Sequence, residues 1–404
     1  MADPTNISRR MTLSSVVQAI TSYGPISRAS VAKMTGLSKQ TVSEIVSSLE
    51  NDGWVQTVGR TEGNVGRRAV VYEIVPDAAL VASVDLGGTK VRVALCNLSG
   101  AVVSEITEPT TQDGGAAVVD QIGKIIIDAA TRQGIGSEKI RVAVVGVPGV
   151  LDSRTGHINL APNINGIDSI DFPALLQARL GIEVLVENDV NLAALGEHWM
   201  THRGDKDDLV FLSIGTGIGA GIVIGGQLVR GSTGGAGEIG YLPFGADPYE
   251  EESRKVGALE RVAATSAIIH HYLELTGKRR SVPEIFEASV SGDAEATQVL
   301  RKAAGYIARA IAAIAAVVDP ACVVIGGSIG AREELIKMIE PEINRCFPRP
   351  IPVEVSVLGN HAALVGGASI ALSRLHIALF SGGLPGAQIV VPPPLLENYQ
   401  ENVA

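Results

Sequence analysis

Three consecutive polar side chains, Glu187, Asn188 and Asp189, end an apolar run and are the first candidates for chemistry in this sequence. The run at 184–186 is typical of a buried strand, and residues 192–195 are typical of the start of a helix. The polar residues therefore fall at a strand-to-helix junction, where open α/β sheets place ligand-binding groups. The alternative is structural, because such side chains also cap helices by accepting their unpaired N–H groups.

Glycine turns between apolar strands form a second candidate site. The order strand, glycine turn, strand, turn, strand, helix, strand begins at residue 80 and again at residue 209, which indicates an internal duplication. Glycine turns let backbone N–H groups approach an anion closely, which suits the phosphates of Mg-ATP. Asp85 is either a carboxylate that helps to hold magnesium or a turn-forming residue. The candidate nucleotide-binding residues are Asp85, Gly87, Gly88, Thr89, Lys90, Gly215, Thr216, Gly217, Gly326 and Gly327.

Two similar α/β halves must position these residues, and they imply a cleft between the halves. With 404 residues the chain is too long for a single core. We expect a first domain at 1–76. A first half at 77–198 would be completed by about 362–404, and the second half would span 199–361.

The first 76 residues have the spacing of a winged helix-turn-helix. Two short helices, capped by Ser27 and Ser38, flank a glycine-containing turn at 35–37. The second helix turns polar side chains outward, as a recognition helix in the major groove does, and a hairpin tip at 59–68 with three arginines suits a wing on the phosphate backbone. A solvated helical adaptor is the alternative. The candidate DNA-binding residues are Ser38, Lys39, Gln40, Thr41, Ser43, Ser47, Arg60, Arg67 and Arg68.

Composition narrows the class of protein. Hydrophobic residues make up 46% and charged residues 19%, which is ordinary for a soluble globular chain. The three cysteines lie far apart and indicate neither disulfides nor a metal knuckle, and no signal peptide or membrane-spanning run is evident, so we expect a cytoplasmic protein. The net charge is −10, but the first 76 residues hold eight Lys or Arg against six Asp or Glu. A mildly basic head therefore precedes an acidic body, which argues against DNA binding by the whole surface.

Four motifs together resemble the ROK family of repressors, open reading frames and sugar kinases. They are Asp85-Leu-Gly-Gly-Thr-Lys, Glu187-Asn-Asp-Val-Asn, Gly215-Thr-Gly-Ile-Gly and Gly234-Gly-Ala-Gly-Glu-Ile-Gly. The resemblance covers nearly all of residues 8–380. It implies an α/β fold with a duplicated actin-like, ribonuclease-H-like ATPase body and an interdomain cleft. The winged helix-turn-helix makes the chain similar to the xylose and N-acetylglucosamine regulators of this family.

The resemblance also implies roles for individual residues. In the family's kinases the aspartate matching Asp189 is the general base that takes the proton of the sugar hydroxyl. Family members hold zinc with a histidine and three cysteines, whose positions here read Tyr241, Glu251, Ser253 and Ala258. These side chains do not make a tetrahedral nitrogen and sulfur site, so we expect no zinc and no other bound metal. The candidate sugar-binding residues are Asn163, Glu187, Asn188, Asp189, Glu238, Tyr241 and Glu260.

The function expected from the sequence is a sugar-responsive transcriptional regulator, a repressor, that binds a double-stranded DNA operator as a homodimer or homotetramer and requires no cofactor. Ligand binding would favour a closed state and change DNA affinity in proportion to its differential affinity for that state. The alternative is an ATP-dependent sugar kinase with an accessory DNA-binding domain, because the glycine turns and Asp189 are present.

Overall fold

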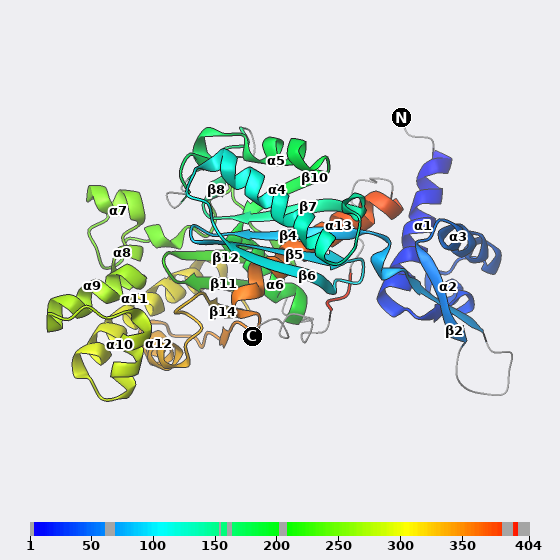
Figure 1. Ribbon diagram of the computed structural model, residues 1–404. Coiled ribbons are helices and arrows are strands. Elements are labelled where there is room, and N and C mark those ends of the chain that lie inside the picture. The colour runs from blue at the N-terminus through cyan, green and yellow to red at the C-terminus, as the bar shows by residue number, and fades with distance from the viewer. Residues whose placement is uncertain are drawn as a thin grey trace. The chain divides into compact units, whose positions relative to one another are not determined.

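The structure, a computed structural model, describes residues 4–60, 69–152, 155–159, 164–201, 208–381 and 391–394 (Figure 1). The chain packs as two units, Met1–Glu187 with Gly367–Ala404, and Asn188–Gly366. The sequence pattern placed the boundaries after residue 198 and before residue 362. They fall elsewhere because helix α6 (Asp189–Thr201) packs on strands β11 and β12 of the second unit.

The N-terminal head of the first unit is a winged helix-turn-helix, as predicted. The hydroxyl of Ser27 caps helix α2 by accepting the Ser30 N–H at 3.1 Å, and that of Ser38 caps helix α3 by accepting the Thr41 N–H at 3.1 Å. Gly36 ends α2 with a φ of 72°, which glycine adopts without steric cost. The head comprises α1 (Pro4–Tyr23), β1 (Ile26–Ser27), α2 (Arg28–Thr35), α3 (Lys39–Asn51), β2 (Val55–Arg60) and β3 (Val70–Ile74), with strand order β1-β3-β2.

Aromatic side chains pack this head against the rest of the first unit. Trp54 meets Phe380 edge to face, with ring centroids 5.7 Å apart. His376 lies about one helical turn before Phe380 in the chain. Its ring centroid is 5.6 Å from that of Phe380, and its Nε2 is 3.3 Å from the carbonyl oxygen of Leu98. Burial lowers the pKa of His376 to about 4, so the ring is neutral at physiological pH. The head is therefore anchored by apolar packing and not only by its linker.

The first unit contains one five-stranded sheet in the order β10-β7-β4-β5-β6. Strands β4 and β7 pair in parallel, whereas β4 and β5 pair in antiparallel fashion, as do β5 and β6. Helix α4 lies across β5 and β6 and buries an apolar stripe against them (Figure 1). Its elements are β4 (Leu80–Leu86), β5 (Lys90–Asn97), β6 (Val102–Pro109), α4 (Gly115–Arg132), β7 (Ile140–Val147), β8 (Val150–Leu151), β9 (Ile158–Asn159), α5 (Phe172–Leu180) and β10 (Glu183–Asn188).

The second unit repeats this arrangement. Its sheet has the order β13-β12-β11-β14-β15, again with a parallel pair, β11 with β14, at its centre. When the order is reversed, each strand matches its counterpart in the first sheet, so the predicted duplication is confirmed. After α6 the elements are β11 (Leu209–Ile214), β12 (Ile218–Ile224), β13 (Gln227–Leu228), α7 (Glu251–Val256), α8 (Glu260–Ala263), α9 (Thr265–Thr276), α10 (Val282–Val290), α11 (Ala294–Val318), β14 (Cys322–Gly326), α12 (Glu333–Cys346) and β15 (Val353–Val355).

The last long helix, α13 (Ala362–His376), continues as the π-helical turn η6 (Ile377–Ser381). The stretch Gly359–Ser381 has the length and composition of a membrane span, with a mean hydropathy of 1.6. Most of it is nevertheless buried within the protein, including Leu364, Val365, Ala368 and Leu372. Its apolar character is therefore that of a core helix.

Gly366 generates a stability prediction because a Cβ there would lie 1.8 Å from the carbonyl oxygen of Leu192 on α6. We expect Gly366→Ala to lower the free energy of unfolding by about 3 kcal/mol through forced separation of two helices. Gly305 in α11 is the matched control, because no atom lies within 4 Å of its added Cβ. Gly305→Ala should stabilise by about 0.5–1 kcal/mol through helix propensity. Calorimetry at one scan rate compares them, and equal melting temperatures would contradict the close approach.

Candidate functional site: a DNA-reading head and a carboxylate cluster

The recognition helix α3 presents only part of its polar face. Lys39 and Gln40 are exposed near its N-terminus, where base contacts are made, and Gln40 donates from Nε2 to Glu44 at 3.0 Å. The hydroxyls of Ser38 and Thr41 lie 2.8 Å apart, beside the helix cap. These four predicted residues lie together at one end of α3. Of the predicted arginines, Arg60 is the last residue of β2, and Arg67 and Arg68 lie outside the described residues.

Ser43 and Ser47 were expected to face outward, and this expectation is wrong in part. Both are half-buried, because Arg28 of α2 donates to the Ser43 hydroxyl at 2.9 Å and to the Ser47 hydroxyl at 3.1 Å. The guanidinium carbon also lies 4.8 Å from the centre of the Tyr72 ring on β3. Arg28 was not predicted from the sequence, because its hydrogen-bond partners lie on a different helix. Arg28 thus ties α2, the recognition helix and the wing sheet together.

The first glycine turn joins β4 to β5 in the first unit. The Gly87 N–H donates to the Lys90 carbonyl oxygen at 2.9 Å, and the Thr110 hydroxyl donates to the Gly87 carbonyl oxygen at 2.7 Å. The turn, which includes the predicted Gly88 and Thr89, is therefore held from both sides. Asp85 precedes it and pairs with Arg92 across the two strands at 3.2 Å, with both side chains largely buried. The carboxylate already has one positive partner.

The second and third glycine turns meet in the second unit. The carbonyl oxygen of Gly215 accepts both the N–H and the hydroxyl of Thr265, at 2.9 and 2.7 Å. A Cβ on Gly327 would lie 2.4 Å from the carbonyl oxygen of Ile214, so glycine is required where the two turns touch. The parallel pairing of β11 with β14 produces this contact, because it brings their carboxyl ends to one edge. The remaining predicted residues of these turns are Thr216, which is exposed, with Gly217 and Gly326.

Two residues of the polar triplet perform the structural role considered for it. Asn188 caps α6, because its Oδ1 accepts the N–H groups of Val190 at 2.9 Å and of Asn191 at 3.0 Å. Asp189 Oδ1 also accepts the Val190 N–H at 2.9 Å. Capping by one carbonyl oxygen leaves the rest of each side chain for other interactions, so a ligand role and a capping role are compatible. Glu187, Asn188 and Asp189 are all half-buried.

A cluster of two carboxylates and a phenol lies in the second unit. Glu260 Oε2 accepts the N–H of Ile218 at 2.8 Å, directly after the second glycine turn. Glu238 follows Gly237, whose φ of 94° and close backbone contact with Ala220 of β12 require glycine. Tyr241 lies one 3-10 turn further along. The structure therefore brings Glu238, Tyr241 and Glu260 to the start of β12, while Asn163 lies outside the described residues.

Burial and mutual repulsion act on this cluster. Burial raises the pKa of Glu238 above its ordinary value. Burial also raises the pKa of Glu260. The hydrogen bond from Ile218 lowers this pKa in part, and the negative charge of Glu238 raises it further. The pKa of Tyr241 is raised by burial, then by the two carboxylates. Partly buried acceptors of this kind are costly for the fold alone and suit a ligand that brings hydroxyl donors.

The four positions where the family resemblance implies zinc ligands make other contacts. The Tyr241 hydroxyl donates to the Lys255 carbonyl oxygen at 3.0 Å, and the Ser253 hydroxyl accepts from Arg261 at 2.6 Å. Ala258 is buried and Glu251 is exposed. Within the described ranges, three or more His, Cys, Asp or Glu side chains nowhere gather as a metal would need.

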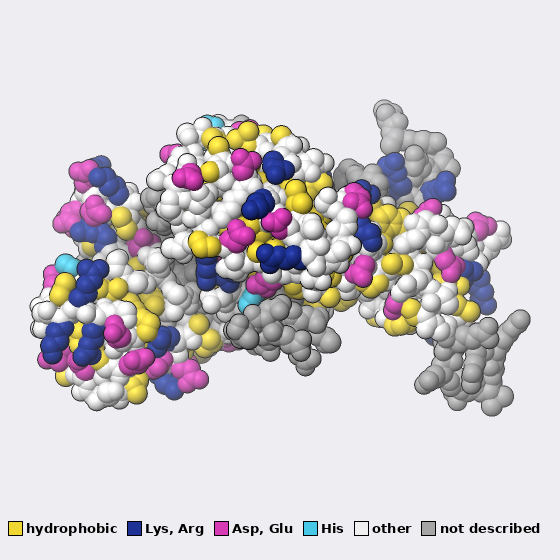
Figure 2. Space-filling model, in the orientation of Figure 1, with side chains coloured by type: hydrophobic (Ala, Val, Ile, Leu, Met, Phe, Trp, Pro, Cys, Tyr) yellow, Lys and Arg dark blue, Asp and Glu magenta, His cyan; other side chains and the backbone are white. Residues whose placement is uncertain are grey.

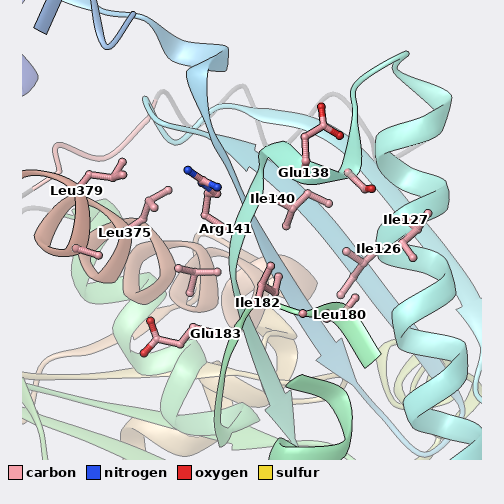
Figure 3. Close-up of a pocket in the computed structure, with 14 residues that line it drawn as sticks. Ile126, Ile127, Glu138, Ile140, Arg141, Leu180, Ile182, Glu183, Leu375 and Leu379 are labelled. Atoms are coloured by element: carbon pink, nitrogen blue, oxygen red, sulfur yellow. The ribbon is translucent and has the colours of Figure 1, made fainter. Parts of the chain in front are cut away.

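A hollow in the first unit is separate from these sites. It has a volume of about 580 Å³ and lies between α4, β7, β10 and α13, with Arg141 and Glu138 among the residues that line it (Figure 3). Glu183 also borders it and pairs with Arg374 at 2.8 Å. Of the predicted sugar, nucleotide and DNA site residues that the structure describes, none lines this hollow.

The fold and its sites define a class of protein in which a winged DNA-binding head is joined to a duplicated actin-like body. Comparisons with known proteins agree. The family model described as ROK family matches residues 81–374, and the model described as winged helix-turn-helix DNA-binding matches residues 13–56. The chain belongs to the ROK family.

Both regulators and kinases are among the relatives. The xylose repressor of Caldicellulosiruptor bescii is 26% identical over 379 residues, covering 89% of this chain and 95% of the repressor. A glucokinase of Halalkalibacterium halodurans is 33% identical over 313 residues, covering 70% of this chain and 92% of the kinase. A crystal structure of a ROK family transcriptional regulator, a homologue of the Escherichia coli MLC protein, matches with a TM-score of 0.74 and 24% identity over 93% of this chain and 97% of that chain. The last match supports the fold.

Arg28 provides a prediction for the DNA-reading head. We expect Arg28→Ala to weaken DNA binding about ten-fold. Without its contacts to α2 and β3, helix α3 must be ordered when DNA binds, and this lost entropy reduces the affinity. Arg28→Lys is the matched control, since it keeps the charge but cannot donate in the same forked geometry to Ser43 and Ser47. Fluorescence anisotropy on a duplex selected by the wild-type protein measures both. Full affinity in Arg28→Lys would show that the charge acts without the bridge.

Proposed function

We propose that this protein is a sugar-responsive transcriptional regulator, a repressor, whose second unit binds a sugar and thereby alters the affinity of the head for operator DNA. One observation supports this most strongly. The similarity to the xylose repressor extends over 89% of the chain, so it includes the winged head as well as the body. The similarity to the glucokinase covers 70%. A DNA-binding head has a purpose in a sensor that a kinase alone does not give it.

The carboxylate cluster is the proposed centre of the sugar site. Glu238 and Glu260 are acceptors for sugar hydroxyls, and Tyr241 offers one hydroxyl beside them. Asn188 and Asp189 at the start of α6 complete the set, and α6 packs against β12, the strand that begins at Ile218. A ligand that donates several hydrogen bonds would relieve the cost of holding these acceptors partly buried.

Regulation requires that the sugar bind two states with different affinity. A ligand that stabilises one conformation of the body changes DNA affinity only through this difference, typically by about 1–3 kcal/mol, or roughly 5- to 150-fold. A homodimer or homotetramer would make the effect larger, since two recognition helices must then match two half-sites on the operator. The cytoplasm is the compartment in which such a regulator acts.

An ATP-dependent sugar kinase is the second candidate function. It is favoured by the 33% identity to a glucokinase and by the intact glycine turns with Asp189. In that case the glycine turns would bind Mg-ATP, and Asp189 would act as general base.

We also propose that the protein needs no zinc. Ser253 and Tyr241, at two of the four implied ligand positions, are engaged by an arginine and by a backbone carbonyl oxygen. Metal analysis of purified, tag-free protein should find less than stoichiometric zinc, and one tightly bound zinc per chain would overturn this proposal.

The proposed function predicts a response to sugars. Glucose, xylose, N-acetylglucosamine and their 6-phosphates are screened by thermal shift, where a ligand at about a hundred times its dissociation constant adds about 2.7 kcal/mol of stability. The sugar that binds should change operator affinity in anisotropy titrations. Glu260→Gln should reduce sugar affinity at least about ten-fold, because a charged acceptor is lost, while binding of DNA without sugar is kept.

Two measurements complete this test. Glu252→Gln, at an exposed carboxylate of α7, is the matched control and should respond to sugar as the wild type does. Incubation with Mg-ATP and the same sugars should release no sugar-dependent ADP. Steady ADP release that is lost in Asp189→Asn, together with an operator affinity that no sugar changes, would establish the kinase instead.

A further inference from the structure

Helix α7 of the second unit has little apolar support, because Ser253 is the one buried residue in it. Leu242, Phe244 and Ala246 before it pack against the core, but a hollow of about 690 Å³ lies between α7 and α9, lined by Glu252 and Val256 on one side and by Ile269 and Leu273 on the other. Acidic and basic side chains are interleaved over the face that α7 exposes (Figure 2). Polar contacts must therefore hold this segment in place.

One side chain supplies the strongest of these contacts. Nη1 of Arg261, in α8, donates to Glu250 Oε2 at 2.5 Å and to the Ser253 hydroxyl at 2.6 Å. These partners lie at the N-cap of α7 and in its middle. Ser253 is 2% exposed and Arg261 is 28% exposed, so both bonds are partly shielded from water. The ion pair of Lys255 with Glu251 is fully on the surface and contributes less.

The neighbouring residue in the same short helix is a member of the carboxylate cluster. Glu260 points to the second glycine turn and accepts the Ile218 N–H, whereas Arg261 points to α7. Helix α8 is therefore held between two attachments made by consecutive side chains. The turn before it is equally constrained, because a Cβ on Gly257 would lie 2.3 Å from the Gly240 carbonyl oxygen. The connection between α7 and α8 is thus packed directly against the backbone that carries Tyr241 of the cluster.

We infer that Arg261 is a positioning residue, which fastens α7 to α8 and thereby holds the Glu260 carboxylate at the glycine turn. The guanidinium performs the cross-linking task that a structural metal ion performs elsewhere: it is a permanent cation that joins groups distant in the chain. Its hold on the segment does not depend on a chelator or on pH near neutrality. The effect of Arg261 on sugar binding rests on the proposed function, whereas its effect on the position of the Glu260 carboxylate does not.

Hydrogen exchange tests the inference without any ligand. In Arg261→Ala the amides of 247–258 should exchange faster, and so should the Ile218 amide, because its acceptor Glu260 is no longer held. We expect about a five- to ten-fold increase for Ile218, as the loss of a partly exposed charged hydrogen-bond pair implies. Amides of β4 and β5 in the first unit should not change. Addition of EDTA to the wild type should change none of these rates.

Two variants make the outcome decisive. Arg254→Ala removes an exposed arginine from α7 itself and should leave the Ile218 rate unchanged. Arg261→Lys should restore part of the protection, since an ammonium reaches Glu250 or Ser253 but does not match the guanidinium geometry. If 247–258 opens in Arg261→Ala while Ile218 keeps its protection, the side chain holds only its own loop and the inference fails. Faster exchange throughout the second unit would mean general destabilisation and would overturn it equally.

The experiments distinguish failure of the proposed function from failure of the positioning role of Arg261. If no sugar binds but Ile218 loses protection in Arg261→Ala, the positioning role stands and the proposed function is wrong. If a sugar binds equally well to Arg261→Ala and wild type and Ile218 is protected in both, the proposed function stands and the positioning role is wrong.

Discussion

The parallel pairing of β11 with β14 is the constraint on which the candidate site depends. Its register aligns Leu209 with Cys322 and Ser213 with Gly326, so both strands end at the same edge of the sheet. At this edge the carbonyl oxygen of Ile214 accepts the N–H groups of Ile329 and Gly330, each at 3.1 Å. A side chain at Gly327 would push the two turns apart. The glycines thus allow the backbones of the two turns to touch. An anion bound there would use the N–H groups that are not already donating between the turns.

The carboxylate cluster uses this edge at a cost to the fold. Glu238 and Glu260 are held near each other with raised pKa values, although water would solvate both carboxylates better. The N–H of Ile218 donates to Glu260 at 2.8 Å, so the backbone supports one of the two carboxylates. A sequence selected for stability alone would place apolar or smaller side chains here. Recognition of a hydroxyl-rich ligand is a sufficient reason to keep them.

Much of the fold was predictable from local sequence, because its signals are local. Ser27 and Ser38 precede their helices and accept the expected N–H groups, and the strands around the two glycine turns follow their apolar runs. The duplicated strand order followed from reading the same succession of elements twice. The capping alternative considered for Asn188 is confirmed, since its Oδ1 caps α6, whereas its ligand role stays a prediction.

The parts that could not be predicted depend on partners distant in sequence. Arg28 reaches Ser43 and Ser47 on the next helix, and Arg261 reaches back to Glu250. Neither contact follows from periodicity, because a long flexible side chain has many possible partners until the elements are packed. The boundary at Glu187 was missed for a similar reason. The pattern marks where α6 begins, whereas only packing shows which sheet it joins.

The attachment of the head limits how a signal can reach DNA. The carbonyl oxygen of Pro76 in the connection accepts the Leu98 N–H at 2.9 Å, and Trp54 rests against Phe380. These contacts lie within the first unit, so the head is packed against that unit and is not attached by its linker alone. Helix α13 belongs to both units, because the division falls after Gly366. Gly366 packs against Leu192 of α6 in the second unit, whereas His376 lies beside Phe380, which contacts Trp54 of the head. Under the proposed function, a sugar bound in the second unit acts on DNA only if it changes the equilibrium of this shared helix or of the first unit, which carries the recognition helix.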